Sequence, residues 1–220
     1  MGVGARARIA VGAPAVELGG VAEPVAFHVV VADLDHLFRS QRHEREILAG
    51  VPARGFVVFI ADEAMAGFGR SGKWFAIHHF DVTPDLLTFA KGVNSGYVPL
   101  GGVAINPAIA ETFAHRAYPG GLTYSGHPLA TAAAVATINA MEDEGIVANA
   151  ARMGDEVLGP LLRDIAARHR CVGEVRGTGV FWALELVADE HTREPLAPYG
   201  GTSEAMTAVV RACKSNGLLP

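Results

Sequence analysis

The sequence has few cysteines and no long uncharged apolar segment. Its 220 residues contain two cysteines, Cys171 and Cys213, which is too few for a disulfide framework. No apolar run approaches the length of about 20 residues that a membrane-spanning helix needs. The weakly apolar N-terminal stretch makes a poor signal peptide, because Gly12, Pro14 and Glu17 interrupt it. We therefore expect a soluble, cytoplasmic protein.

An excess of basic residues is also missing. Lysine and arginine together number 18 against 23 aspartates and glutamates, a formal net charge of −5. This balance offers no basic face for nucleic acid or an anionic membrane. The histidines share no metal-binding spacing with the cysteines, and the G-x-S-x-G motif of serine hydrolases is absent. Hydrophobic residues make up 50% of the chain, and glycines number 26. These values indicate a globular protein with many tight turns.

The apolar pattern predicts alternating strands and helices. We expect strands at 21–26, 56–61, 86–90 and 101–105, and interrupted strand character over 172–187. We expect helices at 33–48, 107–115, 130–141, 146–169 and 202–216, the fourth of them kinked near Gly159-Pro160. This order is typical of an α/β fold with a mostly parallel sheet flanked by helices.

Three parts of the chain differ in how clearly they can be interpreted. Residues 1–55 carry no clear pattern. Residues 56–145 predict part of a large α/β domain, and residues 146–220 predict part of a smaller C-terminal α+β domain.

Lysine is scarce, with Lys73, Lys91 and Lys214 as its three examples. Only Lys91 directly follows a predicted strand and precedes a glycine. An amine held at a buried strand end and partly removed from water is a nucleophile toward carbonyl groups, as in Schiff-base lysines. On position alone, a solvated loop lysine is an equally open interpretation.

Asp62 follows the predicted strand at 56–61. A carboxylate there costs free energy unless it meets a cation or hydrogen-bond donors. It is either a turn aspartate, the partner of a pyridinium nitrogen in pyridoxal 5′-phosphate (PLP), or the magnesium-binding acid of an ATPase. The segment from Gly67 to Lys73 nearly matches the P-loop that the ATPase interpretation requires. However, Trp74 stands where a P-loop has serine or threonine, so we disfavour an ATPase.

Three separated stretches, in the same order along the chain, resemble one enzyme family. They are FVVFIADEAMAGFGRSGKWFAIHHFDVTPDLLTFAKGVNSGYVPLGGVAI at 56–105, GLTYSGHPLATAAA at 121–134 and VGEVRGTGVFWALELV at 172–187. Together they resemble class III aminotransferases of the ω-amino acid, taurine and 4-aminobutyrate type, over about residues 56–220. The separation of 29 residues between Asp62 and Lys91 suits that family. The resemblance implies part of the PLP-transferase fold type I.

The resemblance also implies roles for individual residues. Lys91 would form the Schiff base with PLP and then move a proton, and Asp62 would pair with the pyridine nitrogen. Ala64 lies where the family usually has a valine against the cofactor ring. Thr123 matches a threonine that binds the cofactor phosphate of the neighbouring subunit, which implies a homodimer with shared active sites. Glu23 would line the substrate pocket.

By this resemblance the function is a PLP-dependent transaminase that moves an amino group from an amine or ω-amino acid to a 2-oxo acid such as pyruvate. Two alternatives stay open: a non-catalytic fragment of such an enzyme, and another class III PLP enzyme such as an aminomutase or decarboxylase. The family's N-terminal half has no counterpart here. We also expect the arginine that binds the substrate carboxylate to lie outside this chain, so the sequence is interpreted as a fragment.

Overall fold

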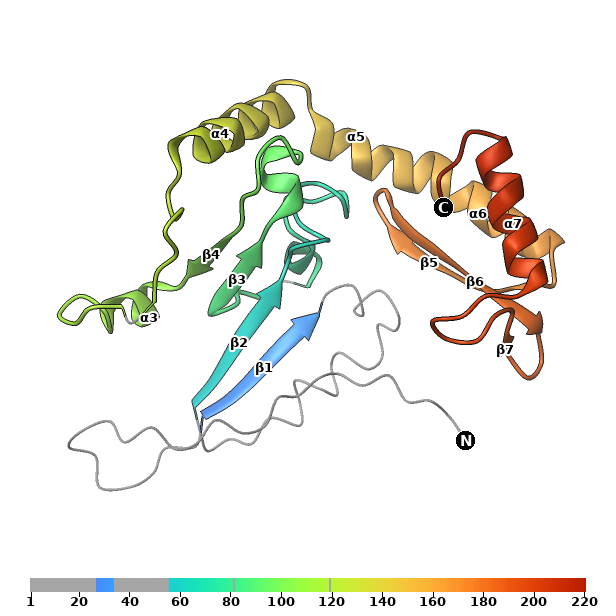
Figure 1. Cartoon of the computed structure of the whole chain (residues 1–220), viewed down its shortest axis with the longest axis horizontal. Helices are drawn as coiled ribbons and strands as arrows, with labels where there is room; N and C mark the ends of the chain where they lie inside the picture. The colour runs from blue at the N-terminus through green and yellow to red at the C-terminus, as the bar shows by residue number, and fades with distance from the viewer. Residues whose placement is uncertain (1–26, 34–55, 81, 119) are drawn as a thin grey trace. The chain divides into compact units, whose positions relative to one another are not determined.

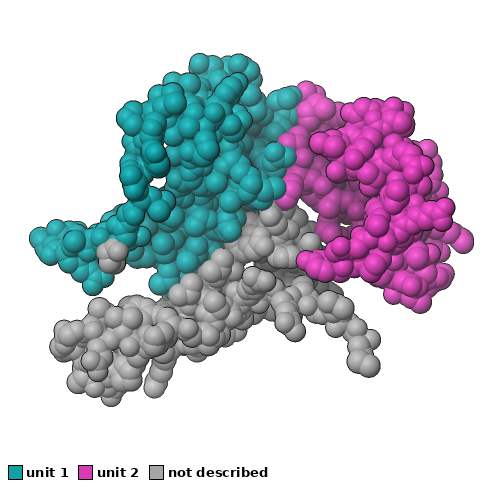
Figure 2. Space-filling model, viewed as in Figure 1, with its two compact units in different colours: residues 1–151 teal, residues 152–220 magenta. Residues whose placement is uncertain are grey.

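The computed structural model describes residues 27–33, 56–80, 82–118 and 120–220. The chain divides into two compact units, Met1–Ala151 and Arg152–Pro220 (Figure 2). The division falls inside a helix, α5 (Ile146–Met153). The domain limits expected from the sequence, after residues 55 and 145, remain predictions.

The first unit is built on a four-stranded sheet (Figure 1). Its strands, in the order in which they lie side by side, are β1 (Phe27–Asp33), β2 (Phe56–Asp62), β3 (Leu86–Phe89) and β4 (Gly102–Ile105). The first three run parallel, and β4 is antiparallel to β3. The continuous apolar run of β2 suits a central strand whose faces are both covered. The expected mostly parallel sheet is confirmed.

The predictions for 56–61, 86–90 and 101–105 are confirmed as β2, β3 and β4. β1 was not predicted. The strand expected at 21–26 lies outside the described residues, as does the helix expected at 33–48 except for its first residue, Asp33, which instead ends β1.

The core of the first unit lies under the loop that follows β2. Ala61, Ala66, Ala76 and Ile77 form a buried cluster, and the last two open the short 3-10 helix η1 (Ala76–His79). Aromatic rings extend this packing: the ring of Phe68 meets those of Phe75 and Phe89 edge to face, at centroid distances of 5.3 and 5.8 Å. Such geometry is favourable for aromatic pairs. The loop is therefore packed onto the end of the sheet.

Three further helices complete the first unit up to α5. They are η2 (Lys91–Asn94), α3 (Pro107–Glu111) and α4 (Pro128–Asp143). Asn106 caps α3, since its side chain accepts a hydrogen bond of 2.8 Å from the N–H of Ile109. α3 ends at Glu111 rather than near residue 115, because its residues are exposed or half-buried and little packing extends so short a helix. α4 ends at Asp143, shortly before Gly145, whose φ of +62° is the left-handed conformation common just after a helix.

The second unit carries an antiparallel sheet and helices. The helix predicted over 146–169 consists of α5, the π-helical turn η3 (Gly154–Leu158) and α6 (Gly159–Arg168). The irregular turn precedes Pro160, which has no N–H for the helical ladder, so the regular α-helix is interrupted next to Gly159-Pro160, and the kink expected there stays a prediction. β5 (Val172–Thr178), β6 (Phe181–Asp189) and β7 (Glu194–Pro195) follow, and then α7 (Glu204–Ser215). Within the described residues, no helix is long and apolar enough to cross a membrane.

Candidate active site

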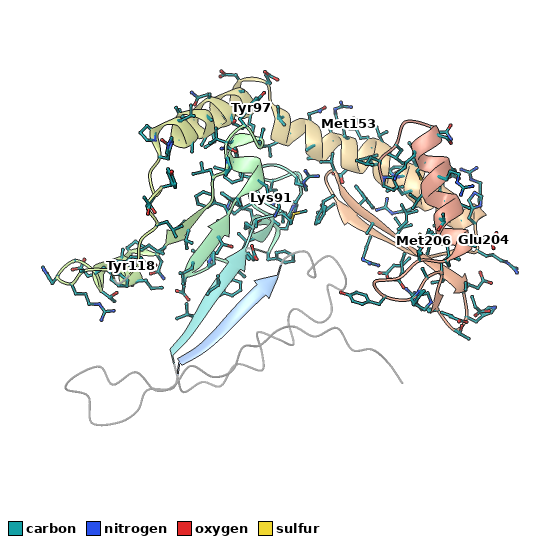
Figure 3. All side chains as sticks on the ribbon, in the orientation of Figure 1. Lys91, Tyr97, Tyr118, Met153, Glu204 and Met206 are labelled. Atoms are coloured by element: carbon teal, nitrogen blue, oxygen red, sulfur yellow. The ribbon has the colours of Figure 1, made fainter. Side chains whose placement is uncertain are left out.

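The two residues singled out by the sequence leave neighbouring parallel strands at the same edge of the sheet. Asp62 is the last residue of β2, and Lys91 follows β3 after one intervening residue. The strand register pairs Asp62 with Thr88, three residues before Lys91. Figure 3 shows the Lys91 side chain beside the carboxyl end of β3. In open α/β sheets this carboxyl edge is where ligands bind.

Two hydrogen bonds hold the carboxylate of Asp62. Its Oδ1 accepts one of 2.9 Å from the hydroxyl of Thr88 and one of 3.1 Å from the backbone N–H of Ala64. Both bonds go to the same oxygen, and within the described part of the chain Oδ2 accepts none. The half-buried side chain therefore keeps one oxygen for a further donor.

Lys91 has a backbone conformation that lysine rarely adopts. Its φ is +46°, in the left-handed region. Gly92 allows the turn to lie close against the loop after β2, since a Cβ there would come 2.8 Å from the Cβ of Phe68. The next two residues, Val93 and Asn94, are buried. Packing on both sides thus holds a strained backbone, and the lysine side chain is exposed.

Glu63, which sequence reasoning did not single out, is fully buried. Its Oε1 accepts a hydrogen bond of 2.7 Å from the N–H of Ile77, and Oε2 accepts one of 3.0 Å from the N–H of Ala76. Burial raises the pKa of the Glu63 carboxyl, although these two hydrogen bonds oppose the shift. Glu63 therefore ties η1 to the end of β2, directly beside Asp62. Its place after a buried strand was the available signal.

The other predicted site residues are less closely connected. Ala64 is half-buried and meets Asp62 through its backbone N–H. Thr123 is exposed in the turn before α4, and within the described residues it makes no hydrogen bond to Asp62 or Lys91. Glu23 lies outside the described residues. The structure thus brings together Asp62, Ala64 and the strand end that leads to Lys91.

This edge of the sheet therefore carries an exposed amine, from Lys91, and a carboxylate held by hydrogen bonds, from Asp62, on neighbouring strands. A family model described as "Aminotransferase class-III" matches residues 47–219. The chain belongs to the class III aminotransferase family. The match begins at residue 47, earlier than the stretch from residue 56 that carried the resemblance in the sequence. Residues 47–55, which carry no clear pattern by themselves, therefore fall within the match.

Relatives of known activity are similar over most of this chain. A taurine–pyruvate aminotransferase of Rhodobacter capsulatus is 38% identical over 164 residues, which cover 72% of this chain and 34% of the relative. A putrescine–pyruvate aminotransferase of Pseudomonas aeruginosa is 40% identical, with 71% of this chain and 33% of the relative covered. The chain thus spans about a third of the length of the curated relatives that it matches.

Solved transaminases have the same fold. The taurine:2-oxoglutarate aminotransferase from Bifidobacterium kashiwanohense, in complex with PLP and glutamate, is 44% identical with a TM-score of 0.70, covering 74% of this chain and 36% of that one. An (S)-enantioselective ω-transaminase from Thermomicrobium roseum is 33% identical with a TM-score of 0.67, covering 89% and 43%. The expected fold class, part of PLP-transferase fold type I, is confirmed, and PLP is the cofactor of this family.

Proposed function

We propose that the whole protein is a PLP-dependent transaminase that moves an amino group from an amine or ω-amino acid to a 2-oxo acid such as pyruvate. One observation carries the proposal: Asp62 and Lys91 leave adjacent parallel strands at one edge, with Oδ2 of Asp62 unpaired among the described residues and the lysine exposed. The related taurine and putrescine enzymes, both of which act with pyruvate by name, support the substrate classes.

The donor set at this edge fits PLP. Lys91 Nζ would bind the aldehyde carbon, and Asp62 Oδ2 would accept a hydrogen bond from the protonated ring nitrogen. When bound, PLP withdraws electrons from the substrate carbon that loses its proton. Lys91 Nζ would take that proton and return it one step later as a general acid. Ala64 would contact one face of the ring, with less surface than a larger residue gives.

A homodimer is part of the proposal. Thr123 would bind the cofactor phosphate of the neighbouring subunit. Its flanks support an interface, because Leu122 and Tyr124 are 81% and 78% exposed, and a cluster of exposed apolar side chains commonly marks an interaction surface. A cytoplasmic location is supported by the two free cysteines, Cys171 and Cys213. Glu23 remains proposed as a substrate-pocket residue.

Titration of the purified chain with PLP tests the cofactor site. We expect a visible absorption band from the lysine-bound cofactor, and we expect Lys91→Ala to abolish it. Lys214→Ala is the matched control, because that lysine is exposed in the last turn of α7 and should leave the band unchanged. A folded wild-type chain that stays colourless would contradict PLP binding by these 220 residues.

The alternative for this chain is a non-catalytic fragment, and one observation favours it: the match covers only 33–34% of the two enzymes' lengths. Product analysis separates the remaining possibilities. A transaminase supplied with an amine donor and pyruvate forms alanine. A chain that binds PLP through Lys91 and forms no alanine would refute the transaminase and leave another class III enzyme, such as an aminomutase or decarboxylase.

A further inference from the structure

Asp62 is held by a residue of the neighbouring strand. Thr88 lies opposite Asp62 in the register of β2 and β3, and its hydroxyl donates a hydrogen bond of 2.9 Å to Asp62 Oδ1. The carbonyl oxygen of the same threonine accepts a bond of 2.9 Å from the N–H of Glu63. Thr88 therefore contacts both the side chain of Asp62 and the backbone of Glu63 at the end of β2.

These contacts restrict how the carboxylate can turn. The last torsion of an aspartate is soft, so a free carboxylate samples many orientations. Here the Thr88 hydroxyl and the Ala64 N–H converge on Oδ1 from two different segments. Threonine is branched at Cβ, which restricts its own first torsion and places the hydroxyl reproducibly. With Oδ1 fixed in this way, the direction of Oδ2 is fixed as well.

We propose that Thr88 is a positioning residue for the cofactor site, because it orients Asp62 so that Oδ2 faces the ring nitrogen of PLP. This inference rests on the proposed function. In this role Thr88 acts through Asp62, whose carboxylate it contacts, and needs no contact of its own with the cofactor. Hydrogen bonds to a charged acceptor are the stronger and more directional kind, which suits this role.

A purely structural role would make different predictions. β2 and β3 are already joined by backbone pairing from Ile60 to Asp62. If the hydroxyl only strengthened that pairing, its removal would lower stability and leave the electronic state of bound PLP unchanged. If the Thr88 hydroxyl orients Asp62, removing the hydroxyl alters how the ring nitrogen of PLP is bound. This change is expected whether or not the variant is also less stable.

Three variants separate the two roles. Thr88→Val removes the hydroxyl and keeps the branched shape, whereas Thr88→Ser keeps a hydroxyl at the same position. Thr83→Val is the matched control: it removes the hydroxyl of an exposed threonine that, among the described residues, makes no hydrogen bond. Each full chain is titrated with PLP. The ring-nitrogen resonance of isotope-labelled PLP and the visible spectrum then report how the cofactor is held.

We expect Thr88→Val to weaken PLP binding about tenfold, the usual effect of losing one hydrogen bond to a charged group. We also expect it to move the ring-nitrogen resonance toward that of unprotonated pyridine. Thr88→Ser should restore both values, and Thr83→Val should match the wild type. A Thr88→Val chain with the wild-type resonance and affinity would overturn the proposal, whatever its melting temperature.

A second measurement does not depend on the cofactor. In crystal structures of the chain without PLP, Thr88→Val should turn the Asp62 carboxylate away from its wild-type orientation, and Thr88→Ser should preserve that orientation. An unchanged carboxylate in the valine variant overturns the role of Thr88. A wild-type chain that binds no PLP would count against the proposed function alone, because the orientation test still decides the role of Thr88.

Discussion

Replacement of Glu63 by alanine should strongly destabilise the first unit. The lost carboxylate is fully buried and accepts hydrogen bonds from the N–H groups of Ala76 and Ile77. An unpaired buried donor costs about 1 to 3 kcal/mol, so two donors and the lost side-chain packing together imply about 3 to 5 kcal/mol. Domains are stable by only about 5 to 15 kcal/mol, so we expect the variant to lose a large fraction of its free energy of unfolding.

Glu63→Gln is the matched control, because it preserves the shape of the side chain and one acceptor oxygen. Its amide nitrogen cannot accept the second hydrogen bond, so we expect a loss of about 1 to 2 kcal/mol. Urea unfolding measures both variants, provided that the slope with denaturant stays constant. An alanine variant within about 1 kcal/mol of the wild type would refute the assigned hydrogen bonds.

The same pair of proteins should differ in how stability depends on pH. Burial raises the pKa of Glu63 above its ordinary value of 4.5, so the folded chain binds this proton more tightly than the unfolded chain. The resulting stabilisation is complete below pH 4.5 and is lost as the pH rises through the raised pKa. The stability of the wild type relative to Glu63→Gln should therefore fall over this range. A difference that is flat with pH would show that the folded carboxyl titrates like an exposed one.

Two further predictions concern separate parts of the chain. Gly92→Ala would place a methyl group 2.8 Å from the Cβ of Phe68, so the turn that carries Lys91 must shift. We expect a loss of about 1 to 3 kcal/mol in thermal unfolding, with weaker PLP binding, and unchanged values would contradict this packing. In the second unit, burial tends to raise the pKa of Glu185. Hydrogen bonds from Arg193 and Arg176 outweigh this effect and lower the pKa below 4.5. This stabilisation is present above pH 4.5 and is lost as the pH falls through the lowered pKa. Because the pair is partly exposed, Arg193→Ala should cost about 0.5 kcal/mol near neutral pH and less in acid, where the hydrogen bond from Arg193 to the carbonyl oxygen of Gly173 remains. A deficit in urea unfolding that is as large in acid as at neutral pH would contradict the ion pair.

Local pattern predicted the strands that carry the site. The apolar runs that end at Asp62 and just before Lys91 form β2 and β3, and the shared direction of these strands brings both residues to one edge. The same kind of run did not predict that β4 is antiparallel, because an apolar strand carries no mark of its partner's direction. β1 was missed because its short apolar run lies in a region without other interpretable signals.

The contacts around Asp62 depend on the pairing of strands far apart in the sequence. Thr88 is an ordinary strand threonine until the register places it opposite Asp62, 26 positions earlier in the chain. Glu63 likewise gains its partners, Ala76 and Ile77, only when the loop folds back. The apolar periodicity of the sequence does not predict these contacts, because they form only through tertiary packing. The sequence could therefore single out Asp62 and Lys91 as candidates and not the residues that contact Asp62.

At Lys91, a left-handed backbone conformation coincides with the amine that is proposed to bind PLP. Glycine adopts φ +46° without a steric penalty, whereas a residue with a Cβ does not. A Lys91→Gly chain should consequently lose the strain that both the natural chain and Lys91→Ala bear, and be harder to unfold than Lys91→Ala, although it lacks the amine that is proposed to bind PLP. The residue that best fits this backbone and the residue that the proposed chemistry requires are therefore different.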